Sequence, residues 1–437
     1  MSTAFPIISW ANGTNIYEVN VRQYTREGSI EAFIPHIPRL HDMGVGILWL
    51  MPITPISLEK RQGSYGSYYA ASSYTDIDPA YGTPDDFHKL IRVAHDLGMK
   101  VIIDWVANHT GYDHQWTKKY PGFYRKNETG GFTELYGWVD VIDLNYEVPE
   151  LREEMIRAMK HWVSTYDIDG FRCDMARTVP IDFWVEARGE CDAVKPLFWL
   201  AECEILEYHE SFDLTYGWEV MRGFDKFFKN ELELAAIIPL LNSYSRYPVG
   251  SEKLLFTSNH DENSDHGTEY EKYGTAAAAM AVFSCTWPGI PLIYSGQELP
   301  NKRRLKFFDK DFIDWEENLP AGGDVRYPGI QLHDFYKTLL TFRKKNKALQ
   351  ESASVLILPS NHPETLVYLC RRRRDKVLVI LNLSKVPASV HFNHPAVAGN
   401  YMELFNGNVH VLQRENSFDL APGEYRVLHE THEQVIV

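Results

Sequence analysis

Four short apolar runs in the sequence end in residues that can carry out acid–base or nucleophilic chemistry. These reactive residues lie in the segments 104–109, 170–174, 198–202 and 258–261. In the second of these, Arg172 and Asp174 are two residues apart, and strand residues at that spacing point to the same side. A guanidinium beside a carboxylate lowers the pKa of that carboxylate and keeps it ionised, as a nucleophile requires. Asp174 is therefore a candidate nucleophile.

Glu202 has the features of a proton donor. It follows the apolar run 198–201, where partial desolvation and neighbouring negative charge would raise its pKa. On neighbouring strands, the carboxyls of Asp174 and Glu202 could lie about 5–5.5 Å apart, the separation expected of a retaining glycosidase. Either acid alone could equally cap a helix or form a surface ion pair. Because four strands of one chain end in polar residues, a catalytic role for these acids is favoured over a purely structural one.

The elements that position these residues alternate between strand and helix. Apolar, often β-branched runs predict strands at 15–19, 46–50, 101–104, 170–174, 198–202, 211–214, 254–257 and 292–294. Helical periodicity predicts helices at 30–43, 84–97, 148–165, 180–192 and 268–283. Eight such units favour an α/β fold, a (β/α)8 TIM barrel, whose reactive groups lie at the carboxyl ends of the strands. The alternative is an open doubly wound sheet, but no glycine-rich phosphate loop follows any strand.

Two segments depart from this alternation. The insertion 109–147 is rich in Gly, Tyr and Trp and predicts a small inserted domain after strand 3. From 348 the hydrophobic pattern has period two, which predicts a C-terminal antiparallel β-sandwich over 348–437. The catalytic barrel would then comprise 1–108 and 148–347. The four arginines at 371–374 are interpreted as a solvated hairpin end rather than a site for polyanions.

Composition narrows the function classes. The 437 residues carry a net charge of −15, and an acidic chain repels phosphate backbones, so we expect no nucleic-acid partner. We expect no membrane partner either, because no apolar run approaches the roughly 18 residues that cross a bilayer. The five cysteines form no CxxC pair, and the N-terminus resembles no signal peptide. We therefore expect a cytoplasmic protein, although a trimmed secreted one would look the same. Nothing in the sequence indicates an oligomeric state.

The polar strand ends resemble the conserved regions of the α-amylase family of glycoside hydrolases, family 13. Three further segments are similar to that family: 44–52 to its second-strand region, 141–145 to the motif that closes its inserted domain, and 288–294 to its eighth-strand region. The resemblance covers essentially the whole chain, and the motifs occur in the family's order.

The resemblance assigns roles to individual residues. It implies that Asp174 is the nucleophile that forms a glycosyl-enzyme intermediate, that Glu202 is the general acid and then the general base, and that Asp261 is a third carboxylate that stabilises the transition state. The residues implied to bind the sugar or to support the acids are Tyr69, Asp104, His109, Arg172 and His260. No cofactor is required for this chemistry.

Within this supporting set, Asp104 would orient Arg172, and the two histidines would donate hydrogen bonds to sugar hydroxyls. Tyr69 would stack on the sugar beside the cut bond, although the run 65–74 contains other tyrosines. A calcium ion is a further implication, because family members that bind it use residues matching Asn108 and Asp143. Without an ion, the same two side chains would hold the inserted segment by hydrogen bonds.

The implied function is retaining cleavage of α-1,4-glucosidic bonds in maltodextrin or starch-type substrates, as in an α-amylase. The alternatives are an α-glucan transglycosylase or an α-glucosidase on the same fold. A non-catalytic carbohydrate-binding relative is disfavoured because all three acids are present. Two departures weaken the transfer of starch specificity. Arg177 and Thr178 stand where many α-amylases have Lys-His, and Glu204 stands where many have an aromatic residue.

Overall fold

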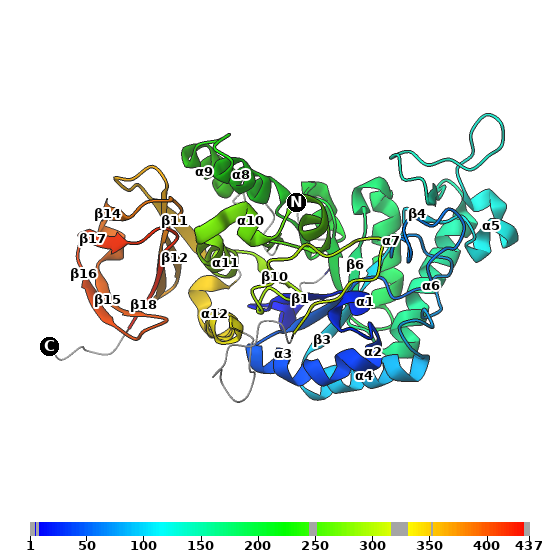
Figure 1. The fold of residues 1–437 in the computed structure, drawn as a ribbon, viewed down its shortest axis with the longest axis horizontal. Helices are drawn as coiled ribbons and strands as arrows, with labels where there is room; N and C mark the ends of the chain where they lie inside the picture. Colours follow the sequence, from blue (N-terminus) through cyan, green and yellow to red (C-terminus); the bar gives the residue numbers. More distant parts are fainter. Residues whose placement is uncertain (1–4, 6–7, 244–250, 316–330, 351–352, 432–437) are drawn as a thin grey trace. The chain divides into compact units, whose positions relative to one another are not determined.

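The computed structural model describes residues 5, 8–243, 251–315, 331–350 and 353–431 (Figure 1). The chain divides into two compact units. The first comprises Met1–Ser9, Ile16–Tyr216 and Tyr294–Leu332. The second comprises Trp10–Asn15, Gly217–Ile293 and His333–Val437. In the described part of the chain, no helix is both long enough and apolar enough to cross a bilayer.

Eight parallel strands form a closed barrel in the order β1-β10-β9-β8-β7-β6-β3-β2. Their bounds are β1 Ile16–Val19, β2 Ile47–Leu50, β3 Lys100–Trp105, β6 Gly170–Cys173, β7 Phe198–Ala201, β8 Leu214–Tyr216, β9 Glu252–Leu255 and β10 Ile290–Tyr294. Apart from Lys100 and Glu252, every residue of these strands is buried, as expected where helices cover a parallel sheet. The predicted (β/α)8 barrel is confirmed.

The sixth barrel strand was predicted at 211–214, and this prediction is wrong by two to three residues. The side chain of Asp213 accepts hydrogen bonds from the backbone N–H of Trp199 at 2.8 Å and from Arg188 at 2.9 Å. Regular pairing with β7 begins only at Leu214, opposite Leu200. The shift matters because it places Tyr216 at the carboxyl end of the strand.

The helices of the first unit lie largely where periodicity predicts them. They are α1 Val21–Tyr24, α2 Ile30–Phe33, α3 Ile37–Met43, α4 Pro84–Asp96, α5 Gln115–Lys119, α6 Pro149–Tyr166 and α7 Ile181–Asp192. The single helix predicted over 30–43 is instead divided by a 3-10 turn at Ile34–His36. Pro35 and Pro38 explain the division, since neither has an N–H to donate along a continuous helix.

A small antiparallel pair forms in the inserted segment after β3. Strand β4, His109–Gly111, pairs with β5, Val141–Asp143, so that His109 lies opposite Asp143. The inserted domain of the predicted fold is therefore present. The domain limits of 109–147 and 348–437 stay a prediction.

The second unit contains helices that the sequence reasoning did not identify. Its helices are α8 Trp218–Phe228, α9 Leu234–Ser243, α10 Glu269–Tyr273, α11 Ala277–Thr286 and α12 His333–Lys345. Of these, α8 and α9 lie side by side (Figure 1), and neither they nor α12 was predicted. The helix predicted over 268–283 is divided into α10 and α11 at Gly274, whose φ of +56° lies outside the helical range.

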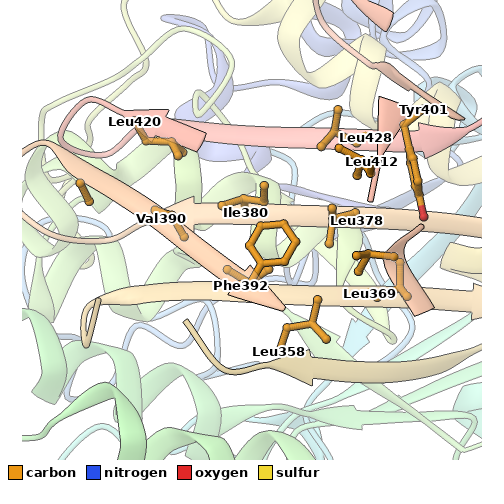
Figure 2. Close-up of a cluster of buried hydrophobic side chains, with 13 residues drawn as sticks. Leu358, Leu369, Leu378, Ile380, Val390, Phe392, Tyr401, Leu412, Leu420 and Leu428 are labelled. Carbon is orange, nitrogen blue, oxygen red and sulfur yellow. The ribbon is translucent and has the colours of Figure 1, made fainter. Parts of the chain in front are cut away.

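The C-terminal part of the second unit is antiparallel. One sheet has the order β11-β12-β13-β18-β15-β16, and a second pairs β14 with β17. The strands are β11 Ser354–Leu358, β12 Thr365–Arg372, β13 Asp375–Asn382, β14 Ala388–Asn393, β15 Gly399–Glu403, β16 Val409–Leu412, β17 Glu415–Leu420 and β18 Tyr425–Glu430. Leu369 and Ile380 of the large sheet and Phe392 of the small one share one buried core (Figure 2). The predicted β-sandwich is confirmed.

The arginine run 371–374 lies at the end of the β12–β13 hairpin. Arg372 pairs with Asp375, and Arg373 adopts a φ of +57° in the turn between them. Three of the four arginines are exposed. The run is therefore a solvated hairpin end, as predicted.

Candidate active site

The carboxyl ends of β3, β6 and β7 bring four of the predicted residues into one place. Asp104 on β3 lies opposite Arg172 on β6, and Cys173 at the end of β6 lies opposite Ala201 at the end of β7. The closeness of β6 and β7 depends on Gly170, because an added Cβ there would lie 2.0 Å from the carbonyl oxygen of Phe198. Asp174 and Glu202, which follow directly after these two strands, therefore leave the sheet as neighbours.

Arg172 is at the centre of this cluster. Its Nη1 lies 3.0 Å from Asp104 Oδ1 and 3.0 Å from Asp174 Oδ1. Its Nη2 lies 3.0 Å from Glu202 Oε1, an ion-pair contact that lacks the alignment of a hydrogen bond. The guanidinium is fully buried, while the side chains of Asp174 and Glu202 are 9% and 13% exposed. One cation thus contacts three carboxylates, and only two of the three reach solvent.

The charge of Arg172 is secured by these acids. Burial lowers the pKa of the guanidinium, but the carboxylates of Asp104 and Glu202 act in the opposite direction and raise its pKa well above the usual range. A permanently charged guanidinium stabilises the ionised form of any carboxylate in contact with it. Asp174 therefore has the environment that a nucleophile needs.

Asp104 is fully engaged as a hydrogen-bond acceptor. Besides Arg172, its Oδ2 accepts from Trp49 Nε1 and from the Tyr69 hydroxyl, each at 3.2 Å. Three donors thus hold this carboxylate in place. Asp104 is therefore suited to orienting Arg172 and not to acting as the nucleophile or the proton donor.

Tyr69 is the tyrosine of the run 65–74 that contacts the acid cluster. The hydroxyl of Tyr74 instead donates to the carbonyl oxygen of Val106 at 2.7 Å, and that of Tyr68 accepts from Asn20 at 2.9 Å. The geometry therefore favours Tyr69 among the candidates for stacking on a sugar. That role stays a prediction.

Glu202 is held from two sides. Its Oε2 accepts the backbone N–H of Met175 at 2.8 Å, while Oε1 contacts Arg172. Met175 adopts a φ of +44°, a left-handed conformation that is costly for a residue with a side chain and is common at functional sites. Both contacts favour the ionised form of Glu202, whereas its partial burial opposes it. The raised pKa expected of a proton donor stays a prediction.

His109 is a buried, neutral histidine at the start of β4. Burial lowers its pKa to about 4, so it carries no charge at neutral pH. Its Nδ1 lies 3.1 Å from the amide nitrogen of Asn108, which leaves the ring proton on Nε2. The ring also packs against Trp138, with centroids 5.4 Å apart. A fixed neutral imidazole of this kind can donate one hydrogen bond to a sugar hydroxyl.

Asn108 and Asp143 are in contact, as both readings of this pair require. The Asn108 amide nitrogen lies 3.4 Å from Asp143 Oδ1. Asp143 Oδ2 is buried and has no hydrogen-bond partner among the described residues. Burial and the nearby charge of Glu134 raise the pKa of Asp143 to about 6. A bound cation would relieve this buried charge, so the pair fits two oxygen ligands of a calcium site.

Within the described residues, no three His, Cys, Asp or Glu side chains come together as a metal-binding group.

His260 and Asp261 belong to the second unit, where they follow β9. His260 is buried, and its Nε2 lies 3.3 Å from Asp261 Oδ1. The Asp261 side chain is 38% exposed and precedes a π-helical turn at Glu262–His266. The convergence of Asp261 with Asp174 and Glu202 stays a prediction.

Comparison with known proteins decides the family. The family description "Alpha amylase, catalytic domain" matches residues 9–130 and 125–213. The crystal structure of a noncanonic maltogenic α-amylase from Thermotoga neapolitana is 30% identical, with a TM-score of 0.85 over 96% of this chain and 99% of that one. The chain belongs to the α-amylase family.

Two further proteins of the α-amylase family are similar over most of their length. An α-amylase structure from Lactobacillus plantarum is 28% identical, with a TM-score of 0.83 over 96% of this chain and 99% of that one. Alpha-amylase 3 of Dictyoglomus thermophilum is 26% identical over 453 residues, which cover 88% of this chain and 87% of the relative.

Sequence reasoning missed two residues that contact Arg172 in this family member. Arg172 Nε donates to the Tyr216 hydroxyl at 3.2 Å, and the ring centroid of Trp49 lies 5.0 Å from the guanidinium carbon. Correct placement of β8 would have identified Tyr216, because it ends that strand. Trp49 carries a weaker signal, since a tryptophan in a buried strand is usually core.

Proposed function

We propose that this protein cleaves α-1,4-glucosidic bonds of maltodextrin or starch-type substrates with retention of configuration, as an α-amylase. The observation that carries the proposal is the contact of Asp174 and Glu202 with the two terminal nitrogens of one buried guanidinium. This contact holds two carboxyls of different surroundings close enough to act on one bond. Relatives named α-amylase, maltogenic α-amylase and cyclomaltodextrinase support an α-glucan as the substrate.

In the proposed mechanism, Asp174 attacks the anomeric carbon while Glu202 protonates the departing glycosidic oxygen. A covalent glycosyl-enzyme forms at the Asp174 carboxylate. Glu202, now ionised, removes a proton from a water molecule that attacks the same carbon, which releases Asp174 and restores the original anomeric configuration. Arg172 keeps Asp174 ionised, and Asp261 is proposed as the further anion that stabilises positive charge on the sugar ring.

The remaining residues bind and orient the sugar in this proposal. Tyr69 presents a ring to one sugar face, because its hydroxyl is fixed by Asp104. His109 donates to a hydroxyl from Nε2, and His260 is proposed to do the same. None of these steps needs a cofactor.

The proposal is tested by a product time course on maltoheptaose and on a branched maltodextrin. Shortening of maltoheptaose, with products initially in the α-configuration, is expected at some pH between 5 and 8. The absence of any shortening over that range would contradict hydrolysis. The size of the first products separates cutting within the chain from trimming at an end.

A second candidate function is transglycosylation by the same residues. One relative is named a maltosyltransferase, and the residues after the nucleophile differ from the Lys-His of many α-amylases. Here Arg177 is exposed, and the Thr178 hydroxyl donates to the carbonyl oxygen of Met175 at 2.6 Å. Oligosaccharides longer than the substrate would favour this function over hydrolysis.

Two further proposals concern a calcium ion and the location of the protein. Asn108 and Asp143 would each supply one oxygen to a calcium ion, which would hold the β4–β5 pair and take no part in bond cleavage. A reduced, cytoplasmic location is proposed because all five cysteines are buried free thiols. Thiol labelling of the unreduced, unfolded protein should detect five free cysteines, and a disulfide would contradict the proposed location.

A further inference from the structure

Phe307 lies beside the tyrosine proposed to stack on the sugar. Its ring is within 14° of parallel to that of Tyr69, with centroids 6.3 Å apart. This separation is at the long end of the range for offset-stacked rings, in which each ring covers only part of the other. Phe307 is only half-buried, although it packs against the core cluster that contains Tyr69. The more exposed Phe307 ring therefore lies directly beside Tyr69, whose hydroxyl contacts the acid cluster.

The backbone around Phe307 is fixed by two buried polar side chains that follow β1. Arg22 donates from Nη1 to the carbonyl oxygen of Gly66 at 3.0 Å and from Nη2 to that of Phe307. Gln23 donates to the carbonyl oxygen of Lys306. Arg22 and Gln23 are both about 2% exposed. The fully buried Arg22 guanidinium thus binds two loop carbonyls and fixes the positions of the two loops.

The two loops that Arg22 joins also bind each other. The backbone N–H and the hydroxyl of Ser64 both donate to Asp309 Oδ1, at 2.9 and 2.7 Å. The N–H of Tyr65 donates to the carbonyl oxygen of Phe308 at 3.0 Å. Segments 63–66 and 306–309 thus form one ridge, and Phe307 is the residue of that ridge that turns its ring to Tyr69.

We propose that Phe307 is a specificity-determining residue that contacts the sugar unit next to the one stacked on Tyr69, and that Arg22 is a positioning residue for it. Pyranose rings present C–H faces that pack on aromatic rings, and a fixed ring loses little entropy on binding. The inference rests on the proposed function, because it extends the same substrate site by one sugar unit.

The test compares Phe307→Leu and Phe307→Tyr with the parent on maltotriose and maltoheptaose. Leucine keeps apolar bulk but removes the flat ring, so KM for maltoheptaose should rise about tenfold, the change that corresponds to about 1.4 kcal/mol of lost contact. The kcat should change less than about threefold, and the sizes of the first products should shift. Phe307→Tyr keeps the flat ring, so its KM, kcat and first products should match those of the parent.

Phe312→Leu is the matched control. Phe312 also lies between β10 and α12, is half-buried like Phe307, and packs against Arg26 with 4.5 Å between the guanidinium carbon and the ring centroid. This variant should leave KM and products unchanged. If Phe307→Leu gave the same KM and products as Phe312→Leu, the inference would be overturned.

A binding experiment separates this inference from the proposed function. In the Glu202→Gln background, the Kd for maltoheptaose should rise about tenfold on Phe307→Leu, with no turnover needed. If the parent bound maltoheptaose but did not cleave it, the proposed hydrolysis would fail while this measurement still tested Phe307. If Phe307→Leu left the Kd unchanged, Phe307 would not contact the sugar.

Discussion

Replacing Arg172 by methionine should destabilise the protein strongly, and by an amount that depends on pH. Arg172 is the fully buried cation that contacts Asp104, Asp174 and Glu202, each at 3.0 Å. Methionine retains much of the volume but leaves three carboxylates together without this charge. Breaking a buried ion pair by removing one partner costs about 3–5 kcal/mol. We expect a loss of this size in the free energy of unfolding at pH 7.

The pH dependence follows from the sign of the altered pKa values. Without Arg172, the three carboxyls repel one another, so their pKa values in the folded state rise above those of the unfolded chain. The penalty is fully present at pH 7 and shrinks as the pH falls and the carboxyls take up protons. The difference between parent and variant should therefore be smaller at pH 5 than at pH 7, as measured by urea unfolding.

Arg343 provides the matched control. It is also buried, but its Nη1 donates to the carbonyl oxygens of Cys285 and Trp287, at 3.0 and 3.3 Å. Burial lowers the pKa of both arginines, but the charge of Glu252 does not offset this effect at Arg343, whereas the carboxylates of Asp104 and Glu202 raise the pKa of Arg172 well above its usual range. The loss of stability on Arg343→Met should therefore depend on pH less than that on Arg172→Met, because three carboxylates contact Arg172 directly. An Arg172→Met loss below about 1 kcal/mol, or one that depends on pH no more than that of Arg343→Met, would contradict this electrostatic role of Arg172.

Three further predictions concern the acids, the proposed metal pair and the buried histidine. Asp174→Asn and Glu202→Gln should fold normally, by circular dichroism, and lose about 100-fold or more of maltoheptaose cleavage; a parental rate in either would remove its proposed role. The pKa of Asp143 is raised to about 6, so its charge destabilises the calcium-free fold progressively above about pH 4 and fully above pH 6. Asp143→Asn should therefore stabilise the calcium-free fold by up to about 3 kcal/mol at pH 7.5 and not at pH 4. Calcium should raise the melting temperature of the parent but not of that variant, and equal gains would argue against the site. Since the pKa of His109 is about 4, His109→Gln should raise KM without moving the activity profile between pH 5 and 8, and a shifted profile would show that the imidazole titrates there.

The acid cluster could be predicted because its residues lie in or directly after regular strands. Parallel barrel strands expose their carboxyl ends at one face, so the positions of Asp104, Arg172, Asp174 and Glu202 follow once the strand ends are recognised. The same logic failed for Tyr216, because a polar turn around Asp213 delays the start of β8.

The ridge that carries Phe307 could not be predicted in this way. Its contacts join segments more than two hundred residues apart, through loop carbonyls bound by Arg22. Neither loop has a hydrophobic period, and a backbone carbonyl leaves no trace in the sequence of the residue that carries it. The two helix breaks were missed because the apolar period continues through them, although Pro35 and Gly274 interrupt the helices themselves.

Trapping the covalent bond that Asp174 is proposed to form with the sugar would identify the nucleophile. A fluorinated α-glucosyl fluoride, whose fluoride leaves readily while hydrolysis of the intermediate is slowed, would be incubated with the protein, which is then digested and analysed by mass spectrometry. One added glycosyl group is expected on the peptide that contains Asp174, and none in the Asp174→Asn variant. A label on Glu202 or elsewhere, or an unlabelled protein that releases product of inverted configuration, would contradict this role of Asp174.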